Sequence, residues 1–376
     1  MDEYYMRQAL TIAQYALGRT TPNPLVGAIV VKDGRIVGQG WHRKAGTAHA
    51  EIHALNHAGE LARDATLYVT LEPCSHCGLT GPCTDAVIQS GVKKVVVAMA
   101  DPNPLVAGKG IALLRNAGIE VTEGVLAQDA AKLNEVFIKW ISCGLPFGVL
   151  KTAMSLDGKI ACHTGCSKWI TGTEARSYVH RLRDRYDGIM VGIGTILADD
   201  PELTVRLPAG GRNPVRIIVD SYARTPLTAK VVTDRKAPTI IAVTPGAPAS
   251  QVASLQDAGV EVLTIEPGPN GVNLHALFQS LGCRKITSVL VEGGAQINAS
   301  ALAANIVDKL YCFIAPKLIG GVNAPGPIGG CGAAIMDHAI SLEDIEYEHI
   351  GEDILVIANI FKREGRNVYR TCGRIG

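Results

Sequence analysis

The sequence lacks an apolar run that approaches the roughly 18 residues needed to cross a bilayer, so we expect no membrane-spanning segment. It also lacks an excess of charge, since 36 Lys and Arg face 35 Asp and Glu and leave a formal net charge of +1. That balance gives no electrostatic basis for wrapping nucleic acid or lying on a membrane. The first five residues, Met-Asp-Glu-Tyr-Tyr, are followed by no apolar signal core, and we therefore expect a cytoplasmic location.

Cysteine is not scarce, but it gives little evidence of disulfides. A chain of 376 residues without a secretion signal is expected to keep its ten cysteines reduced. Most are scattered and are predicted to be ordinary buried or surface thiols. Cys74, Cys77 and Cys83 fall together in one short segment, which indicates a specific role for this cluster.

The length and the pattern predict two folded domains. A chain of 376 residues is too long for one comfortable core, and 47% hydrophobic residues are typical of a folded protein. Strand-like and helix-like patterns alternate in both halves, which predicts an α/β fold class. The segment Cys143-Gly144-Leu145-Pro146 ends a helical connector, so we place the boundary there, with domains at 1–145 and 146–361. Residues 362–376 form a basic, glycine-bearing tail that we expect to be disordered.

The individual elements follow from apolar periodicity and from turn residues. In the first half, the patterns predict helices at 2–17, 50–62, from 83, 108–117 and within 124–145, and strands at 26–31, 36–37, 66–70, 92–99 and 119–122. In the second half, they predict strands at 149–153, 188–192, 215–220, 239–243, 260–265, 288–292 and 354–361, and helices at 173–185 and 295–304.

A catalytic metal site is predicted from His49-Ala50-Glu51, Pro73-Cys74-Ser75-His76-Cys77 and Pro82-Cys83. A catalytic zinc takes three protein ligands and leaves a fourth position for water, whose pKa falls to about 7. One histidine and two cysteines meet that count, and Glu51 beside the metal is placed to move a proton from water to a departing amine. This H-x-E plus P-C-x-x-C pattern is typical of zinc nucleobase deaminases. A structural zinc site is the alternative, but it takes four ligands and needs no spare glutamate.

The third ligand is open between two cysteines. Cys77 fits the general deaminase spacing after Cys74, whereas Cys83 lies nine positions after Cys74. Cys83 precedes the apolar positions of a predicted helix, and a helix N-terminus favours the thiolate, so the residues alone lean toward Cys83. His53 and His57 repeat the spacing of His49 along the same helix, but such a repeat is mostly accidental.

The second half contains a weaker signal. The predicted strand 288–292 runs through Gly293-Gly294 into a helix, and backbone N–H groups at a helix N-terminus bind phosphate groups well. A glycine pair after a strand is more often a plain turn. It is not the G-x-G-x-x-G fingerprint, so a Rossmann-type domain is not supported.

These motifs together resemble one family, the bifunctional riboflavin biosynthesis deaminase/reductases. The resemblance rests on runs spread over residues 1–361: His49–Leu55, Thr70–His76, Asp101–Pro104, Lys151–Gly158, Trp169–Thr171, Ala198–Pro201 and Val291–Gly294. It implies a cytidine-deaminase-like α/β/α sandwich at 1–145 and a dihydrofolate-reductase-like α/β domain at 146–361. It also implies one zinc ion, NADPH, and a homo-oligomer formed through the reductase domain.

The resemblance implies two successive reactions on a phosphorylated pyrimidine. The first would deaminate 2,5-diamino-6-(5-phosphoribosylamino)pyrimidin-4(3H)-one. The second would reduce the ribosyl unit to ribityl with NADPH and give 5-amino-6-(5-phosphoribitylamino)uracil. The family's long-spaced cysteine pair falls on Cys74 and Cys83, with His49 as the third zinc ligand and Glu51 as the catalytic residue. Its deaminase substrate contacts fall on Asn23, His42, His76 and Asn103.

The same resemblance implies the residues of the reductase site. The cofactor-binding positions are Ala153, Trp169, Thr195, Asp199, Ser221, Gly294, Ala295, Gln296, Ile297, Asn298, Ala299 and Ser300. The substrate-binding positions are Ser167, Arg183, Leu203, Arg206 and Glu292, to which we add Lys151. Guanidinium groups suit a sugar phosphate, which favours the two arginines, although ordinary surface arginines would look the same. Lys151 and Asp199 are the candidate polar groups near the reacting sugar, and the sequence identifies neither as a proton donor.

One segment departs from the family pattern. At 79 the family commonly has a basic residue suited to the substrate phosphate, and here the residue is Leu79; Gly81 replaces a common proline. Two rival hypotheses are a free cytidine or guanine deaminase joined to an unrelated reductase, and a zinc-stabilised RNA-editing module. The near-zero net charge, with only ten Tyr, five Phe and three Trp, gives the RNA hypothesis little support.

Overall fold

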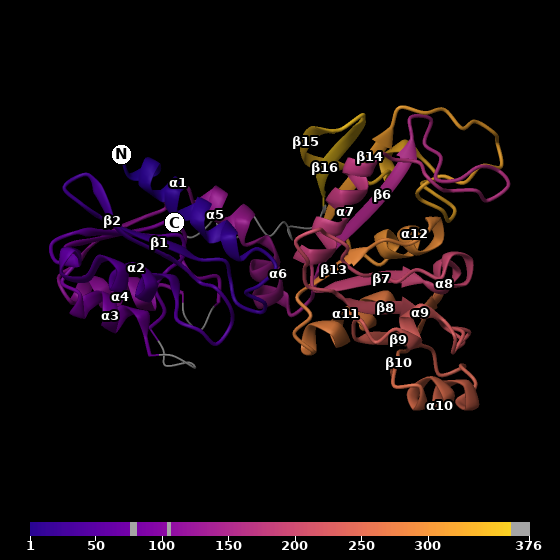
Figure 1. Cartoon of the computed structure of the whole chain (residues 1–376), viewed down its shortest axis with the longest axis horizontal. Coiled ribbons are helices and arrows are strands. Elements are labelled where there is room, and N and C mark those ends of the chain that lie inside the picture. Colours follow the sequence, from indigo (N-terminus) through magenta and orange to yellow (C-terminus); the bar gives the residue numbers. More distant parts are fainter. Residues whose placement is uncertain (76–80, 104–106, 362–376) are drawn as a thin grey trace. The chain divides into compact units, whose positions relative to one another are not determined.

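The computed structural model describes residues 1–75, 81–103 and 107–361. They form two compact units, Met1–Gly144 and a second that begins at Leu145 (Figure 1). The predicted positions His76, Cys77 and Leu79 and the tail 362–376 lie outside the described residues.

The first unit contains, in its described part, a five-stranded sheet in the order β2-β1-β3-β4-β5. These strands are β1 (Gly27–Lys32), β2 (Arg35–Trp41), β3 (Thr66–Val69), β4 (Lys94–Val97) and β5 (Glu120–Glu123). β1 is antiparallel to β2 and β3, whereas β3, β4 and β5 are parallel. Asp33 and Gly34 join β1 to β2 with φ values of 50° and 75°, as a tight hairpin turn requires, which confirms the predicted hairpin.

Helices cover both faces of this sheet. They are α1 (Asp2–Ala13), α2 (Ala50–Ala58), α3 (Cys83–Gln89), α4 (Lys109–Asn116), α5 (Ala127–Leu133) and α6 (Glu135–Cys143), with short 3-10 turns η1 (Gln14–Ala16) and η2 (Gly59–Ala62). Figure 1 shows α1 and α5 on one side of the strands and α2, α3 and α4 on the other. This arrangement is the predicted α/β/α sandwich.

Helix α2 lies unusually close to β2 because β2 contains two glycines. A Cβ added at Gly40 would lie 2.6 Å from the carbonyl oxygen of Ala50, and one at Gly38 would lie 2.2 Å from that of Ala54. Any larger residue at either position would push the helix away from the sheet. The two glycines therefore allow α2 to lie directly against β2 along its length.

The second unit contains, in its described part, a nine-stranded sheet in the order β10-β9-β8-β7-β13-β6-β14-β16-β15. The strands are β6 (Phe147–Ser155), β7 (Gly188–Gly192), β8 (Val215–Val219), β9 (Thr239–Val243), β10 (Glu261–Thr264), β13 (Ser288–Val291), β14 (Lys309–Ala315), β15 (Leu342–Ile350) and β16 (Asp353–Ile360). The seven neighbouring strands β10, β9, β8, β7, β13, β6 and β14 are parallel. β16 and β15 are antiparallel and form one edge of the sheet. A separate small pair joins β11 (Pro267–Gly268) to β12 (Gly271–Val272).

Alternating side chains of the parallel strands enter two different cores. Met190, Ile217 and Ile240 pack with helices α11 (Leu274–Cys283) and α12 (Ala295–Ala303). Their neighbours Ile189 and Ile218 pack on the other face with α8 (Ile193–Asp199), α9 (Lys230–Thr233) and α10 (Ala249–Asp257). Strands buried on both faces explain the continuous apolar runs from which the sequence predicted them.

A further helix, α7 (Thr173–Arg185), packs by Tyr178 against Phe313 of β14, with ring centroids 5.7 Å apart. A 3-10 turn η3 (Met336–His338) precedes β15.

Most predicted elements are confirmed, and the main differences are these. The predicted helix 2–17 ends at Ala13, and the helical connector is two helices that meet at Asn134. Strands β14 and β15 were missed; β15 reads as a charged, exposed segment because it lies at the edge of the sheet. No described helix is both long enough and apolar enough to cross a membrane.

Candidate active sites

The first site is formed around the N-terminus of α2. His49 has extended backbone angles, φ −77° and ψ 167°, and immediately precedes the helix, while Glu51 lies in its first turn. A residue just before a helix and a residue in its first turn present their side chains toward the same end of that helix. The motif His49-Ala50-Glu51 therefore places a potential metal ligand beside a potential proton carrier.

Two cysteines meet His49 from different elements. Cys74 follows β3, and Cys83 is the first residue of α3. The Nδ1 atom of His49 lies 3.0 Å from Sγ of Cys83 and 3.5 Å from Sγ of Cys74. In the part of the chain that the structure describes, these three residues form the one group of ligand atoms, all within 4.8 Å of each other, that could hold a metal ion.

The donor set fits zinc. Tetrahedral zinc with a nitrogen at about 2.0 Å and a sulfur at about 2.3 Å separates those two donors by about 3.5 Å. The cluster is close to that spacing, and three ligands leave one position for a reacting water. A hydrogen bond from the Cys83 thiol lowers the pKa of Cys74, and His49 acts in the same direction, so Cys74 takes the thiolate form that metals bind.

Glu51 is buried beside this cluster, with 3% of its surface exposed. Burial raises the pKa of its carboxyl to about 7, an effect that the positive charge of His49 partly opposes. A hydrogen bond also joins Glu51 to Cys83. Glu51 thus lies beside the candidate metal ligands without being one of them.

Asn23 and His42 are joined by a hydrogen bond and lie next to His49. Nδ1 of His42 lies 3.2 Å from the carbonyl oxygen of Ala48, which can only accept, so Nδ1 donates and carries the proton. Nε2 of His42 then accepts from the amide of Asn23 at 3.1 Å. The His42 ring stands edge-on to His49, with centroids 5.3 Å apart, and burial lowers the pKa of His42. Two of the four predicted substrate contacts are therefore next to a candidate metal ligand.

Of the other two, His76 lies outside the described residues, and Asn103 lies in the loop after β4. The backbone N–H of Asn103 donates to Oδ1 of Asp101 at 2.8 Å. Glu72 belongs to the motif Thr70–His76, whose pattern indicates no role for it, but its buried carboxylate accepts the backbone N–H of Asp101 before Asn103.

The predicted cofactor residues of the second unit gather at the carboxyl ends of its central parallel strands. Ala153 is near the end of β6, Thr195 and Asp199 are in the helix after β7, and Ser221 follows β8. The run from Gly294 to Ser300 starts α12, directly after β13. Since β8, β7, β13 and β6 are adjacent and parallel, all these positions lie at the carboxyl ends of neighbouring strands, where ligands bind in open α/β sheets.

The N-terminus of α12 has room for a ligand. A Cβ built at Gly294 would meet nothing within 4 Å. The Oδ1 atom of Asn298 is buried and has no hydrogen-bond partner among the described residues, while its amide nitrogen donates to Pro327. Ile297 is buried in the core and can offer a ligand only its backbone. These features fit a phosphate-bearing cofactor at this helix end.

Trp169 and Asp199 are linked through Lys168. The Lys168 ammonium lies 3.0 Å from Oδ1 of Asp199, and the Trp169 ring, 64% exposed, has the guanidinium of Arg176 at 4.7 Å from its centroid. Lys317 donates to the carbonyl oxygen of Trp169 at 2.9 Å. These bonds hold the segment with Trp169, and with the exposed Ser167 two positions earlier, next to the end of α8.

A buried group of charges lies at the end of β13. Arg183 of α7 donates from Nε and from the second terminal nitrogen to the two oxygens of Glu292, at 2.8 and 2.9 Å. Lys151 of β6 lies close enough to feel both charges: burial lowers its pKa, Arg183 lowers it further, and Glu292 raises it. Three of the predicted substrate residues are therefore one electrostatic unit, and the carboxylate partner of Arg183 argues against the alternative of an ordinary surface arginine.

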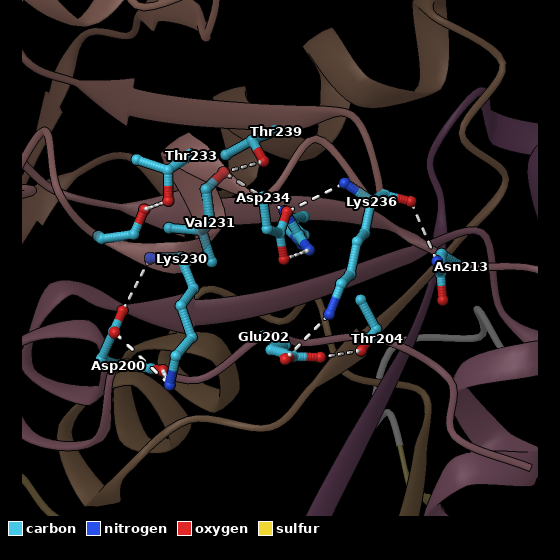
Figure 2. Close-up of polar contacts among 12 residues, drawn as sticks. Asp200, Glu202, Thr204, Asn213, Lys230, Val231, Thr233, Asp234, Lys236 and Thr239 are labelled. Carbon is cyan, nitrogen blue, oxygen red and sulfur yellow. Dashed lines mark hydrogen bonds and ion pairs between the residues drawn. The ribbon is translucent and has the colours of Figure 1, made fainter.

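The loop that carries Leu203 and Arg206 is fixed from two sides. Leu203 is buried with φ 52°, an uncommon conformation for a branched side chain. Figure 2 shows one side, where Lys236 lies 3.0 Å from Glu202 and Lys230 binds Asp200. On the other side, Arg183 donates to the carbonyl oxygen of Thr204 at 3.1 Å.

His180 was not anticipated from the sequence. Its Nδ1 accepts the backbone N–H of Arg206 at 3.3 Å. Burial lowers the pKa of His180 to about 4, and the charges of Arg183 and Arg206 act in the same direction. Only its position one turn before Arg183 on a predicted helix would have indicated it.

Comparisons with known proteins agree with both sites. Residues 1–99 match the family model for the cytidine and deoxycytidylate deaminase zinc-binding region, and residues 146–356 match the RibD C-terminal domain. The riboflavin biosynthesis protein RibD of Actinobacillus pleuropneumoniae is 46% identical over 355 residues, 94% of each chain. That of Bacillus amyloliquefaciens is 46% identical over 372 residues, covering 98% of this chain and 100% of the relative.

Solved structures give the same result. Acinetobacter baumannii RibD superposes with a TM-score of 0.86 at 40% identity and covers 96% of this chain and 99% of its own. A diaminohydroxyphosphoribosylaminopyrimidine deaminase/5-amino-6-(5-phosphoribosylamino)uracil reductase from Thermotoga maritima has a TM-score of 0.83 at 38% identity, with the same coverage.

A zinc-binding deaminase domain followed by a reductase domain defines a bifunctional enzyme, at once a hydrolase and an oxidoreductase. The deaminase domain is a zinc-binding one, and the reductase domain implies NADPH as its cofactor. The chain belongs to the RibD family of bifunctional riboflavin biosynthesis enzymes.

Proposed function

We propose that residues 1–145 deaminate 2,5-diamino-6-(5-phosphoribosylamino)pyrimidin-4(3H)-one to the corresponding uracil. Residues 146–361 then reduce its ribosyl unit with NADPH and give 5-amino-6-(5-phosphoribitylamino)uracil. The observation that carries the proposal is the meeting of His49, Cys74 and Cys83 beside the buried Glu51, in a chain whose other unit is a RibD reductase domain.

In the deaminase unit, His49, Cys74 and Cys83 are the residues that would hold zinc. When bound, zinc supplies a Lewis acid that lowers the pKa of water to about 7. A carboxylate oxygen of Glu51 takes a proton from the attacking water. Glu51 then gives this proton to the amino group on the ring carbon, which leaves as ammonia. Its burial keeps bulk solvent away from that carboxylate.

The substrate ring is oriented by Asn23, His42 and Asn103. His42 is held neutral with its proton on Nδ1, and the amide of Asn23 is held through Nε2 of that ring. This leaves the carbonyl oxygen of Asn23 to accept from a ring N–H or amino group. We assign His76, outside the described residues, to the same group.

In the reductase unit, the cofactor would lie at the carboxyl ends of β8, β7, β13 and β6, with its phosphates toward the N-terminus of α12. When bound, NADPH supplies the hydride. Lys151, Arg183 and Glu292 bind the sugar, since they form the charged group at the same edge. Arg206, exposed and close to His180, binds the sugar phosphate.

The proposal is tested first on Glu51. Glu51→Gln keeps the shape of the side chain but removes the proton carrier, so the purified variant should contain as much zinc as the wild type and release ammonia at least about 100-fold more slowly. Undiminished ammonia release would end the assignment.

The same assay of zinc content decides the third ligand. Cys83→Ala should lose zinc, because the other ligands then number two, whereas Cys77→Ala should retain it. Retention by Cys83→Ala together with loss by Cys77→Ala would transfer the role to Cys77.

We also infer a homo-oligomer formed through the reductase unit. Strand β15 is at the edge of the sheet, with exposed backbone groups, and Tyr347 and Ile345 on it are 70% and 45% exposed. Sedimentation should give at least twice the mass of one chain for the wild type and one chain for Tyr347→Lys. Equal masses for both would contradict this interface.

A further inference from the structure

Glu72 lies two residues before Cys74, in the short connection after β3. Its side chain is almost fully buried, with 3% of the residue exposed. The backbone N–H of Glu72 donates to the carbonyl oxygen of Met99 at 3.0 Å, which ties this connection to the end of β4. None of the roles assigned above uses the Glu72 carboxylate.

That carboxylate accepts four backbone hydrogen bonds from one segment. Oε2 accepts from Asp101 at 3.1 Å and from Gly108 at 2.9 Å. Oε1 accepts from Gly110 at 2.8 Å and from Ile111 at 3.2 Å. The first two donors flank the loop that contains Asn103, and the last two lie in the first turn of α4. One side chain therefore joins both ends of that loop and the helix that follows it.

The close packing around Gly110 leaves no room for a side chain at this position. A Cβ at Gly110 would lie 2.1 Å from the carbonyl oxygen of Pro73 and 3.2 Å from Oε1 of Glu72. The first turn of α4 thus lies directly against the residue that precedes Cys74. Glu72 therefore joins the segment that carries the metal ligand Cys74 to the residues that flank Asn103.

We propose that Glu72 is a positioning residue of the deaminase site: its four hydrogen bonds set the place of Asn103 relative to the metal ligands, and so determine how tightly the pyrimidine binds. This inference rests on the proposed deaminase function. Glu72 acts without touching the substrate or the metal, through its hydrogen bonds with the backbone N–H groups of Asp101, Gly108, Gly110 and Ile111.

Glu72→Gln is the sharpest change available. It keeps the size of the side chain but replaces one acceptor oxygen by an NH2 group. Whichever way the amide is turned, two of the four N–H groups then face another donor instead of an acceptor. The backbone of Asp101 and Gly108, and with it Asn103, should lose its fixed place, while Cys74 and Cys83 keep theirs because their contacts with His49 do not involve Glu72.

The test uses the full-length, zinc-loaded enzyme and measures three quantities: zinc content, the kinetics of ammonia release from the pyrimidine ribotide, and NADPH oxidation with the deaminated product. For Glu72→Gln we expect unchanged zinc, a KM for deamination raised at least tenfold, a kcat reduced less than threefold, and unchanged reduction. Glu60→Gln, an exposed glutamate of the same unit, is the matched control and should change none of these. Loss of zinc, or a fall in kcat at constant KM, would overturn the positioning role.

A double variant separates positioning from general weakening. If Glu72 acts through Asn103, then adding Glu72→Gln to Asn103→Ala should raise KM less than threefold. A KM of the double variant raised by the product of the two single effects would overturn the proposal.

Should Glu72→Gln fail to fold, Asp101→Ala is the second variant, because it removes the acceptor of the Asn103 N–H. It should also raise KM for deamination, and an unchanged KM would overturn the proposal. A wild type that releases no ammonia from this ribotide would instead reject the proposed function itself.

Discussion

Arg183 and Glu292, 109 positions apart in the chain, face each other as a two-pronged ion pair with N–O distances of 2.8 and 2.9 Å. Their side chains are only 14% and 6% exposed. Burial alone would raise the pKa of Glu292, but Arg183 outweighs it and holds that pKa below the usual value. The pair therefore keeps a full negative charge next to Lys151 at the edge of the sheet where the cofactor residues gather.

Removing that charge should impair reduction alone. Glu292→Gln keeps the shape but leaves Lys151 and Arg183 without their carboxylate, so we expect kcat/KM for NADPH oxidation to fall at least about 100-fold, or roughly 3 kcal/mol. Ammonia release by the same preparation is the internal control and should not change. Equal loss of both activities would indicate misfolding, and no loss would remove Glu292 from the site.

His180 should make the stability of the second unit depend on pH. Its pKa is about 4 in the folded chain and near 6.5 when unfolded, so the unfolded chain binds more protons between these values. His180 therefore takes nothing from the free energy of unfolding above pH 6.5. As the pH falls from 6.5 toward 4, protonation of His180 in the unfolded chain lowers that free energy. We expect His180→Gln to weaken this loss by about 1–2 kcal/mol, measured by denaturant unfolding at pH 7.5 and 4.5. Identical pH slopes for variant and wild type would contradict the assignment.

Two neighbouring ion pairs, Arg216 with Asp234 and Lys236 with Glu202, should differ sharply in their contribution to stability. Arg216 is fully buried and binds both oxygens of Asp234 at 2.7 Å, whereas Lys236 and Glu202 are 50% and 31% exposed. Arg216→Met removes the fully buried guanidinium and leaves the Asp234 carboxylate, whose side chain is only 12% exposed, without its ion-pair partner, so it should cost about 3–5 kcal/mol in the free energy of unfolding. Lys236→Met is the matched control, because it breaks an exposed pair, and should cost less than about 1 kcal/mol. Similar costs for the two variants would contradict the structure.

Much of the deaminase site follows from the sequence because its signals are local. His49 and Glu51 belong to one helix start, and Cys83 begins a helix that its own neighbours predict. Each residue's position within its element is set by the nearby chain, and the residue types then indicate the chemistry. The hairpin at Asp33-Gly34 was predictable for the same reason.

What the sequence did not reveal depends on distant partners. The donors to Glu72 lie 29 to 39 positions downstream, and nothing in the motif around Glu72 names them. The partner of Arg183 and the role of His180 are likewise set by the packing of separate strands and loops. Strand β15 was missed because an edge strand with charged, exposed side chains lacks the apolar alternation that marks a half-buried strand.

The central claim, that one chain deaminates and then reduces the same phosphorylated pyrimidine, is tested most directly by giving the zinc-loaded enzyme the diaminopyrimidine ribotide and NADPH together. Ammonia and NADPH are then followed in the same sample. We predict that ammonia is released first, that NADPH absorbance falls after a lag, and that the two reach equal molar amounts. NADPH consumption without ammonia, or ammonia without any NADPH consumption, would contradict the account.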